Sequence, residues 1–111
     1  MAREIRSPVS SGCRVIAFVG PAGTGKSQRA QMVAQENEVD FLIDDGLVIS
    51  KGRIMAGKSA KSERNLVRAI RRALFQFPDH RKAVRAFLQK SAPCKIMIIA
   101  TSISMAEKIT R

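Results

Sequence analysis

The sequence predicts an α/β domain with a mostly parallel sheet and an added β-hairpin. Three short, mainly apolar runs, at 15–19, 39–43 and 95–100, have the composition of strands that are buried on both faces. Segments with apolar residues at helical spacing separate these runs, which is the alternation expected of βα units. The 111 residues, 45% of them hydrophobic, suffice for one small domain with a core, and we assign it to residues 13–111.

The first twelve residues are polar and contain Pro8 and a Ser-Ser-Gly sequence, so we expect a flexible lead-in over 1–12. The first strand is predicted at 14–19 and leads into a glycine-rich turn. A helix is then predicted from Ser27 to Glu36, because Ala30, Val33 and Ala34 recur on one side.

The turn at 20–27 reads Gly-Pro-Ala-Gly-Thr-Gly-Lys-Ser and fits the pattern G-x-x-x-x-G-K-[ST] of a phosphate-binding loop, the Walker A motif. Its glycines allow positive φ angles and let backbone N–H groups approach an anion closely. Lys26 has the charge and the reach to contact β- and γ-phosphates, and the Ser27 hydroxyl is a suitable ligand for Mg²⁺.

These residues resemble the P-loop nucleoside-triphosphatase superfamily. The resemblance implies a P-loop three-layer sandwich, in a truncated or minimal version, that binds ATP or another nucleoside triphosphate with Mg²⁺. The nucleotide-binding residues that it implies are Gly20, Pro21, Ala22, Gly23, Thr24, Gly25, Lys26, Ser27 and Gln28. The chain stops at Arg111 inside a helical pattern, which favours the N-terminal part of a longer protein.

A second stretch, at 52–59, satisfies the same pattern. It lacks a middle glycine, and the β-branched Ile54 resists the positive φ that a phosphate-binding loop requires. The β-rich runs 47–50 and 53–56 flank Lys51-Gly52, which is typical of a tight hairpin. We therefore predict a hairpin here and a nucleotide loop at the first copy.

The run 39–43 is followed by Asp44-Asp45-Gly46. Phosphoryl transfer needs a carboxylate near the Mg²⁺ that Ser27 would bind, and the strand 95–100 ends without one. We predict that Ser27, Asp44 and Asp45 hold the metal and that Lys26, Asp44 and Asp45 are catalytic, one aspartate activating a hydroxyl or water. The alternative is that Asp-Asp-Gly only shapes a turn.

The elements over 20–45 are a G-x-x-G-x-G-K-S loop, a helix and an apolar strand that ends in Asp-Asp. This order is similar to the bacterial HPr serine kinase/phosphorylase family. In that family the tandem aspartates serve Mg²⁺ binding and catalysis, which the resemblance implies for Asp44 and Asp45.

A small basic joint at 57–62 leads to two predicted helices that Pro78 separates. Asp79 is expected to cap the second helix, with His80 exposed in its first turn, and a strand at 95–100 and a helix from Ser104 follow. The first of the two helices is predicted to bury Leu66, Val67, Ile70, Ala73, Leu74 and Phe77 and to turn Arg64, Arg68, Arg71 and Arg72 outward. The second is predicted to bury Ala83, Val84, Phe87 and Leu88.

Three groups of polar residues each have two interpretations. Thr101 and Ser102 follow the last strand and would either sense a γ-phosphate or cap the next helix. Lys58 and Lys61 would bind a second phosphate-bearing ligand or line a solvated joint. One of the four arginines at 64, 68, 71 and 72 would be an arginine finger, or all four are surface charge.

The formal net charge is +11, and the stretch 51–90 holds twelve basic residues against only Glu63 and Asp79. Such a block attracts nucleic acid or an acidic protein, unless it is simply a solvated face. Cys13 and Cys94 each precede a predicted strand, so parallel pairing of those strands would bring two free thiols together. No apolar run is long enough to span a membrane and no signal core is present, which favours a cytoplasmic protein.

Two functions therefore follow from the sequence. The first is an ATP- and Mg²⁺-binding P-loop domain, an ATPase or kinase. The alternative is a basic module that binds nucleic acid or an acidic partner and whose nucleotide site is regulatory.

Overall fold

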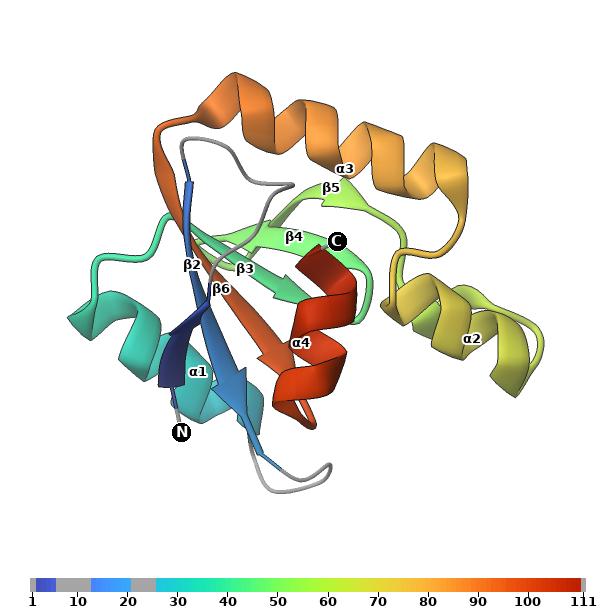
Figure 1. Cartoon of the computed structure of the whole chain (residues 1–111), viewed down its shortest axis with the longest axis horizontal. Coiled ribbons are helices and arrows are strands. Elements are labelled where there is room, and N and C mark those ends of the chain that lie inside the picture. The colour runs from blue at the N-terminus through green and yellow to red at the C-terminus, as the bar shows by residue number, and fades with distance from the viewer. Residues whose placement is uncertain (1, 6–12, 21–25, 111) are drawn as a thin grey trace.

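The computed structural model describes residues 2–5, 13–20 and 26–110, which form an α/β domain (Figure 1). In chain order its elements are β1 (Ala2–Ile5), β2 (Cys13–Val19), α1 (Lys26–Glu36), β3 (Phe41–Asp44), β4 (Leu47–Ser50), β5 (Arg53–Gly57), the 3₁₀ helix η1 (Ala60–Ser62), α2 (Leu66–Ala73), α3 (Pro78–Ser91), β6 (Cys94–Ala100) and α4 (Ile103–Thr110).

The six strands form one mixed sheet in the order β1-β2-β6-β3-β4-β5. Only β6 pairs in parallel, with β2 on one side and β3 on the other. The other three pairings are antiparallel, so the prediction of a mostly parallel sheet is wrong. The physical reason is the short turns after β3 and β4, which return the chain antiparallel and leave no room for a crossover helix.

The N-terminal segment also differs from the expected flexible lead-in. Residues 2–5 pair antiparallel with β2 and form an edge strand of the sheet. Residues 6–12 lie outside the described part of the chain.

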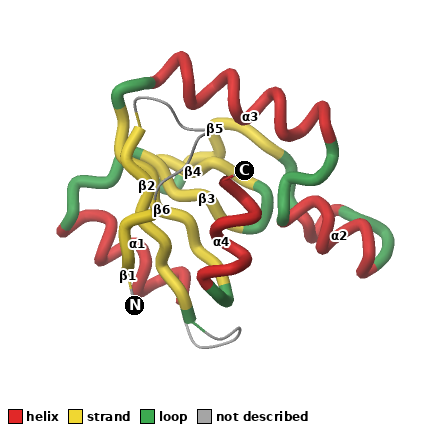
Figure 2. The backbone as a smooth tube through the Cα atoms, in the orientation of Figure 1, coloured by secondary structure: helices red, strands yellow, loops and turns green. Residues whose placement is uncertain are grey.

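Helices cover both faces of the sheet (Figure 2). α3 and α4 pack on one face, where Val84, Leu88 and Ala106 join a core built on β2, β3 and β6. α1 packs on the other face through Ala30 and Ala34, which meet Phe18, Met97 and Ile99. Successive residues of β2 and β6 alternate between these two cores, which explains why both strands are apolar from Val15 and Ile96 onward.

The packing of the α2 region agrees with the prediction only in part: Ala73, Leu74 and Phe77 are partly buried and Arg64, Arg68 and Arg71 are exposed, as predicted, but four other residues differ. Leu66, Val67 and Ile70 are exposed, whereas Arg72 is buried. The Arg72 guanidinium lies 4.2 Å from the centroid of the Phe77 ring, and its Nη2 is 3.6 Å from Oε2 of Glu63. The predicted helix from Glu63 also begins later, because Asn65 caps it by accepting a 2.8 Å hydrogen bond from the Arg68 N–H.

α3 begins at Pro78 with Phe77 at the N-cap position, so Asp79 lies in its first turn and does not cap it. As predicted, α3 buries Val84 and Leu88, and Phe87 is half-buried, but the prediction that it buries Ala83 is wrong, because that side chain is exposed.

The second pattern match forms a hairpin, as predicted. Lys51 and Gly52 make the turn between β4 and β5, both with positive φ. Gly57, with φ +95°, lies where an added Cβ would collide with the carbonyl of Gly46, itself at φ +83°. The two glycines of this stretch thus serve a turn and a close backbone crossing.

Candidate functional site

The carboxyl ends of β2, β6 and β3 meet at one edge of the sheet. The parallel registers place Val19 level with Ala100 and Ile43 level with Ile98. Gly20 therefore follows β2 beside the end of β6, where its N–H donates to the Ala100 carbonyl at 3.2 Å. Ligands of open α/β sheets commonly bind at such a carboxyl edge.

The predicted nucleotide loop starts and ends at this edge. Gly20 extends β2, and α1 begins at Lys26 and continues through Ser27 and an exposed Gln28. Pro21, Ala22, Gly23, Thr24 and Gly25, and the side chains of Lys26 and Ser27, lie outside the described part of the structure. The structure thus gives the strand before the loop and the helix after it.

Asp44 is the last residue of β3 and lies at the same edge. Leu42 packs in the core under α1 and Ile43 in the core under α3 and α4, so the pleat directs Asp44 to the face of the sheet that α1 covers. Because β6 stands between β2 and β3, two strand spacings, about 10 Å, separate Asp44 from the end of β2. A half-buried carboxylate and a hydroxyl are hard oxygen donors, which fit Mg²⁺ chemically.

Asp45 makes contacts of a different kind. It is in the turn after β3 with φ +55°. Its Oδ2 accepts a hydrogen bond from the Ser59 hydroxyl, and its carbonyl accepts one from the Ala60 N–H at 2.9 Å. These contacts tie the β3–β4 turn to the start of η1, which is the role that the turn interpretation gives Asp45.

Thr101 and Ser102 follow β6 at the same edge, between the ends of β2 and β3. The Ser102 hydroxyl accepts a 3.1 Å hydrogen bond from the Met105 N–H in the first turn of α4, which is a capping contact. The exposed Thr101 hydroxyl is 3.4 Å from the Met105 sulfur. Lys58 precedes η1 and Lys61 lies within it, and both are exposed, as either interpretation of the joint requires.

His80 is buried, so the prediction of an exposed first-turn residue is wrong. Its ring stacks on Phe75, and its Nε2 lies 2.8 Å from the Gly46 carbonyl oxygen and 3.2 Å from the Lys58 nitrogen. Burial lowers the pKa of His80, the hydrogen bond to Gly46 opposes this, and the charges of Arg72 and Lys58 lower it further. The ring thus holds the turn that follows Asp44. At Gly46 itself an added Cβ would collide with the Lys58 carbonyl oxygen.

The two cysteines lie at the opposite, amino edge of the sheet. Cys13 and Cys94 are register partners in the parallel pair β2–β6, so the expected proximity of their thiols is confirmed. The two Sγ atoms are 2.7 Å apart, one thiol donating to the other, and both cysteines are free. Burial, together with the contact to Cys13, raises the pKa of Cys94 to about 12, which makes that thiol a poor nucleophile.

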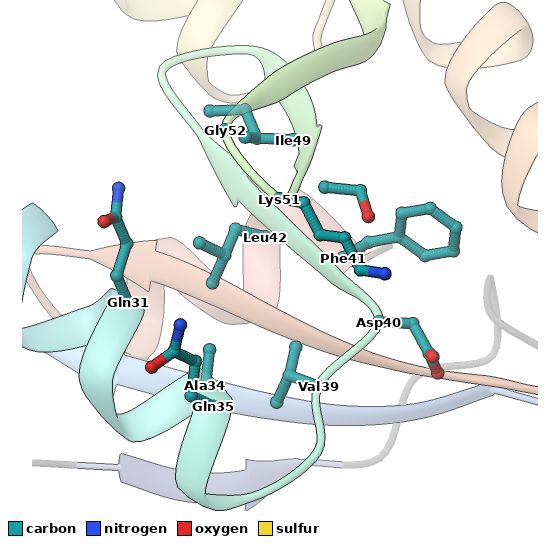
Figure 3. A pocket seen from close by; sticks show the side chains of 11 residues that line it. Gln31, Ala34, Gln35, Val39, Asp40, Phe41, Leu42, Ile49, Lys51 and Gly52 are labelled. Atoms are coloured by element: carbon teal, nitrogen blue, oxygen red, sulfur yellow. The ribbon is translucent and has the colours of Figure 1, made fainter.

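A hollow of about 820 Å³ lies away from the carboxyl edge. Gln31 and Gln35 of α1, Leu42 of β3 and the tip of the β4–β5 hairpin border it (Figure 3). Its carboxylate, Asp40, accepts a 2.7 Å hydrogen bond from the Lys95 N–H, so it serves the connection into β3. This hollow brings none of the predicted catalytic residues together.

No family model, curated protein or solved structure matches this chain. Within 2–5, 13–20 and 26–110, no three His, Cys, Asp or Glu side chains gather into a group that would hold a metal ion. None of the helices in this described part is long and apolar enough to cross a membrane.

Proposed function

We propose that this chain is a cytoplasmic P-loop domain that binds ATP·Mg²⁺ and carries out ATPase or kinase-type phosphoryl transfer. One observation carries the proposal: the phosphate-binding sequence at 20–27 connects β2, a strand with helices on both sides, to a helix that begins at Lys26. A P-loop three-layer arrangement is part of the proposal, supported by α1 on one face and α3 and α4 on the other.

In this proposal each residue has a defined task. The backbone at 20–27 and the Lys26 ammonium bind the phosphates. Ser27 and Asp44 hold Mg²⁺, which supplies positive charge to the phosphate oxygens. Asp44 is favoured over Asp45 as the metal ligand, because Asp44 ends β3 on the face of the sheet that α1 covers, whereas Asp45 lies in the turn that follows.

Nucleotide binding tests the proposal directly. A fluorescent ATP analogue titrated with Mg²⁺ should bind the wild-type chain, and Lys26→Ala should weaken binding at least about tenfold because a charge-assisted contact is lost. Lys58→Ala is the matched control, since Lys58 holds the same place in the second pattern match but lies beside η1. Equal binding by wild type and Lys26→Ala, or none by either, contradicts the proposal.

A second pair of variants distinguishes the roles of Asp44 and Asp45. Asp44→Asn should reduce the Mg²⁺ dependence of nucleotide binding, whereas Asp45→Asn should chiefly lower stability through the lost contact to Ser59. Isothermal titration with and without Mg²⁺, beside thermal unfolding, distinguishes the two effects. A Mg²⁺ dependence that Asp44→Asn leaves unchanged removes Asp44 from the site.

A nucleic-acid-binding function is the second candidate, and α3 favours it. Arg81, Lys82, Arg85 and Gln89 border a shallow groove of about 500 Å³ along this helix, with no carboxylate among the residues that line it. Lysine and arginine side chains on one helix suit contacts to phosphates of a nucleic-acid backbone. Outside α3, most basic residues of the 51–90 block are also exposed.

Duplex DNA and duplex RNA should then bind with an affinity that falls steeply as salt is added. Replacing Arg81, Lys82 and Arg85 by glutamine should reduce the salt slope more than the same change at Lys51, Arg53 and Lys61. Equal losses in the two triple variants mean diffuse attraction and no site on α3.

A further inference from the structure

α2 presents apolar side chains to solvent although its other side is firmly held. Leu66, Val67 and Ile70 are 74%, 69% and 51% exposed. On the opposite side, Glu63 lies 3.5 Å from Arg68 and 3.6 Å from Arg72. Because contacts on its charged side fix the orientation of this helix, the exposed apolar side is a defined surface of the fold.

The apolar side of α2 continues into a groove of about 350 Å³ between α2 and α4, which we call the α2–α4 groove. Thr101 and Ser102, at the end of β6, border it, so the groove opens beside the carboxyl edge of the sheet. Its lining residues are Ile70, Ala73, Leu74, Thr101, Ser102, Ser104, Met105 and Lys108. An amphipathic helix that lays its apolar stripe across neighbouring helices uses a surface of this kind.

The charges around the groove define the partner. Lys108 lines it, and no carboxylate is among the described residues that line it. Arg71 is exposed and follows Val67 by one helical turn, so it borders the apolar side of α2. We propose that the α2–α4 groove binds an amphipathic helix of a partner protein that carries acidic side chains beside its apolar stripe.

A second copy of this chain fits the groove poorly. In a twofold interface the same patch faces itself, so Lys108 and Arg71 of one copy would approach the same residues of the other. Each chain also carries a formal charge of +11, which adds a net repulsion between two copies. An acidic helix turns both features into attraction.

The test uses three labelled helical peptides and fluorescence anisotropy with the whole chain. One peptide has leucine at i, i+3, i+4 and i+7 with glutamate beside the stripe, the second has lysine in place of glutamate, and the third has the composition of the first in scrambled order. The first should bind at least about tenfold more tightly than the other two. Equal binding of the first and third means charge attraction alone and overturns the proposal.

Matched variants locate the binding. Ile70→Ser should weaken the glutamate peptide at least about tenfold, whereas Ile54→Ser, which changes an isoleucine 65% exposed on β5, should not. Lys108→Glu should weaken it more than Arg85→Glu, which changes the net charge equally on α3. Because the altered side chains at 54 and 70 are exposed, thermal unfolding of both serine variants should match wild type.

Two outcomes overturn the proposal at this stage. One is that Ile70→Ser and Ile54→Ser weaken peptide binding equally, and that Lys108→Glu and Arg85→Glu do so as well. The other is a wild-type chain that dimerises in sedimentation while Ile70→Ser remains monomeric, because the groove then belongs to a second copy.

Discussion

α2 and α3 follow each other in the chain and both are amphipathic and basic, yet they bury different kinds of side chain. α3 buries Val84 and Leu88 and leaves Arg85 exposed, whereas α2 buries Arg72 and leaves Leu66 exposed. A helical period therefore defines two faces of a helix, and what lies next to it decides which face is buried.

The difference has a local cause. The side of α2 that carries Arg72 meets the Phe77 ring and a carboxylate, Glu63, whose side chain is only 10% exposed. α3 instead lies along the sheet, where Phe87 meets Phe41 edge to face at 5.3 Å between ring centroids. The aromatic ring and the buried acid stabilise a buried guanidinium, as the apolar core stabilises a buried leucine.

The largest expected effect contrasts two leucines. Leu88→Ala should lower the free energy of unfolding by about 2–5 kcal/mol, because it leaves a cavity in the core under α3. Leu66→Ala should change it by less than about 0.5 kcal/mol, because that side chain is exposed on α2. Urea denaturation measures both, and equal losses would mean that α2 buries its apolar side after all.

A smaller effect contrasts two acids. Glu63→Gln removes the counter-charge of the buried Arg72 and should cost about 1–3 kcal/mol. Asp79→Asn removes the same charge from the exposed first turn of α3 and should cost less than about 1 kcal/mol. The same denaturation experiment compares them; a larger loss for Asp79→Asn would show that the ion pair does not hold α2.

The smallest effect is a pH dependence that joins the two helices, since Arg72 of α2 helps to lower the pKa of His80 in α3. A lowered folded-state pKa means that the unfolded chain binds more protons below about pH 6.5, so stability falls as the pH drops through that value. The slope from one group is at most about 1.4 kcal/mol per pH unit.

Between about pH 7.5 and about pH 5, wild type should therefore lose more stability than His80→Gln, as measured by thermal unfolding. The carboxylates titrate in both proteins and cancel in the comparison. Parallel curves for the two proteins would show that the buried imidazole is not the group responsible.

Much of the fold could be predicted from local pattern. Strand β6 is apolar from Ile96 to Ala100 because both of its neighbours run parallel to it and both of its faces are covered, and this signal is strong in the sequence. The Lys51-Gly52 turn is equally local. The pairing of residues 2–5 with β2, the orientation of α2 and the burial of His80 depend on distant residues, so no local pattern reports them.

The candidate site divides in the same way. The sequence predicts which residues follow β2 and β3, and the parallel register brings Gly20 and Asp44 to one edge. The sequence does not show that Asp44 and its neighbour Asp45 differ in their surroundings. In the structure, Ser59, fourteen positions further along the chain, donates a hydrogen bond to the Asp45 carboxylate.

Gly46 and Gly57 lie at a close backbone crossing where no other amino acid fits. A methyl group at either position would strike backbone atoms, which have no rotamer to escape into. In a saturation library selected for folding, only glycine should remain at these two positions. Gly52, where an added Cβ meets nothing within 4 Å, should still accept asparagine.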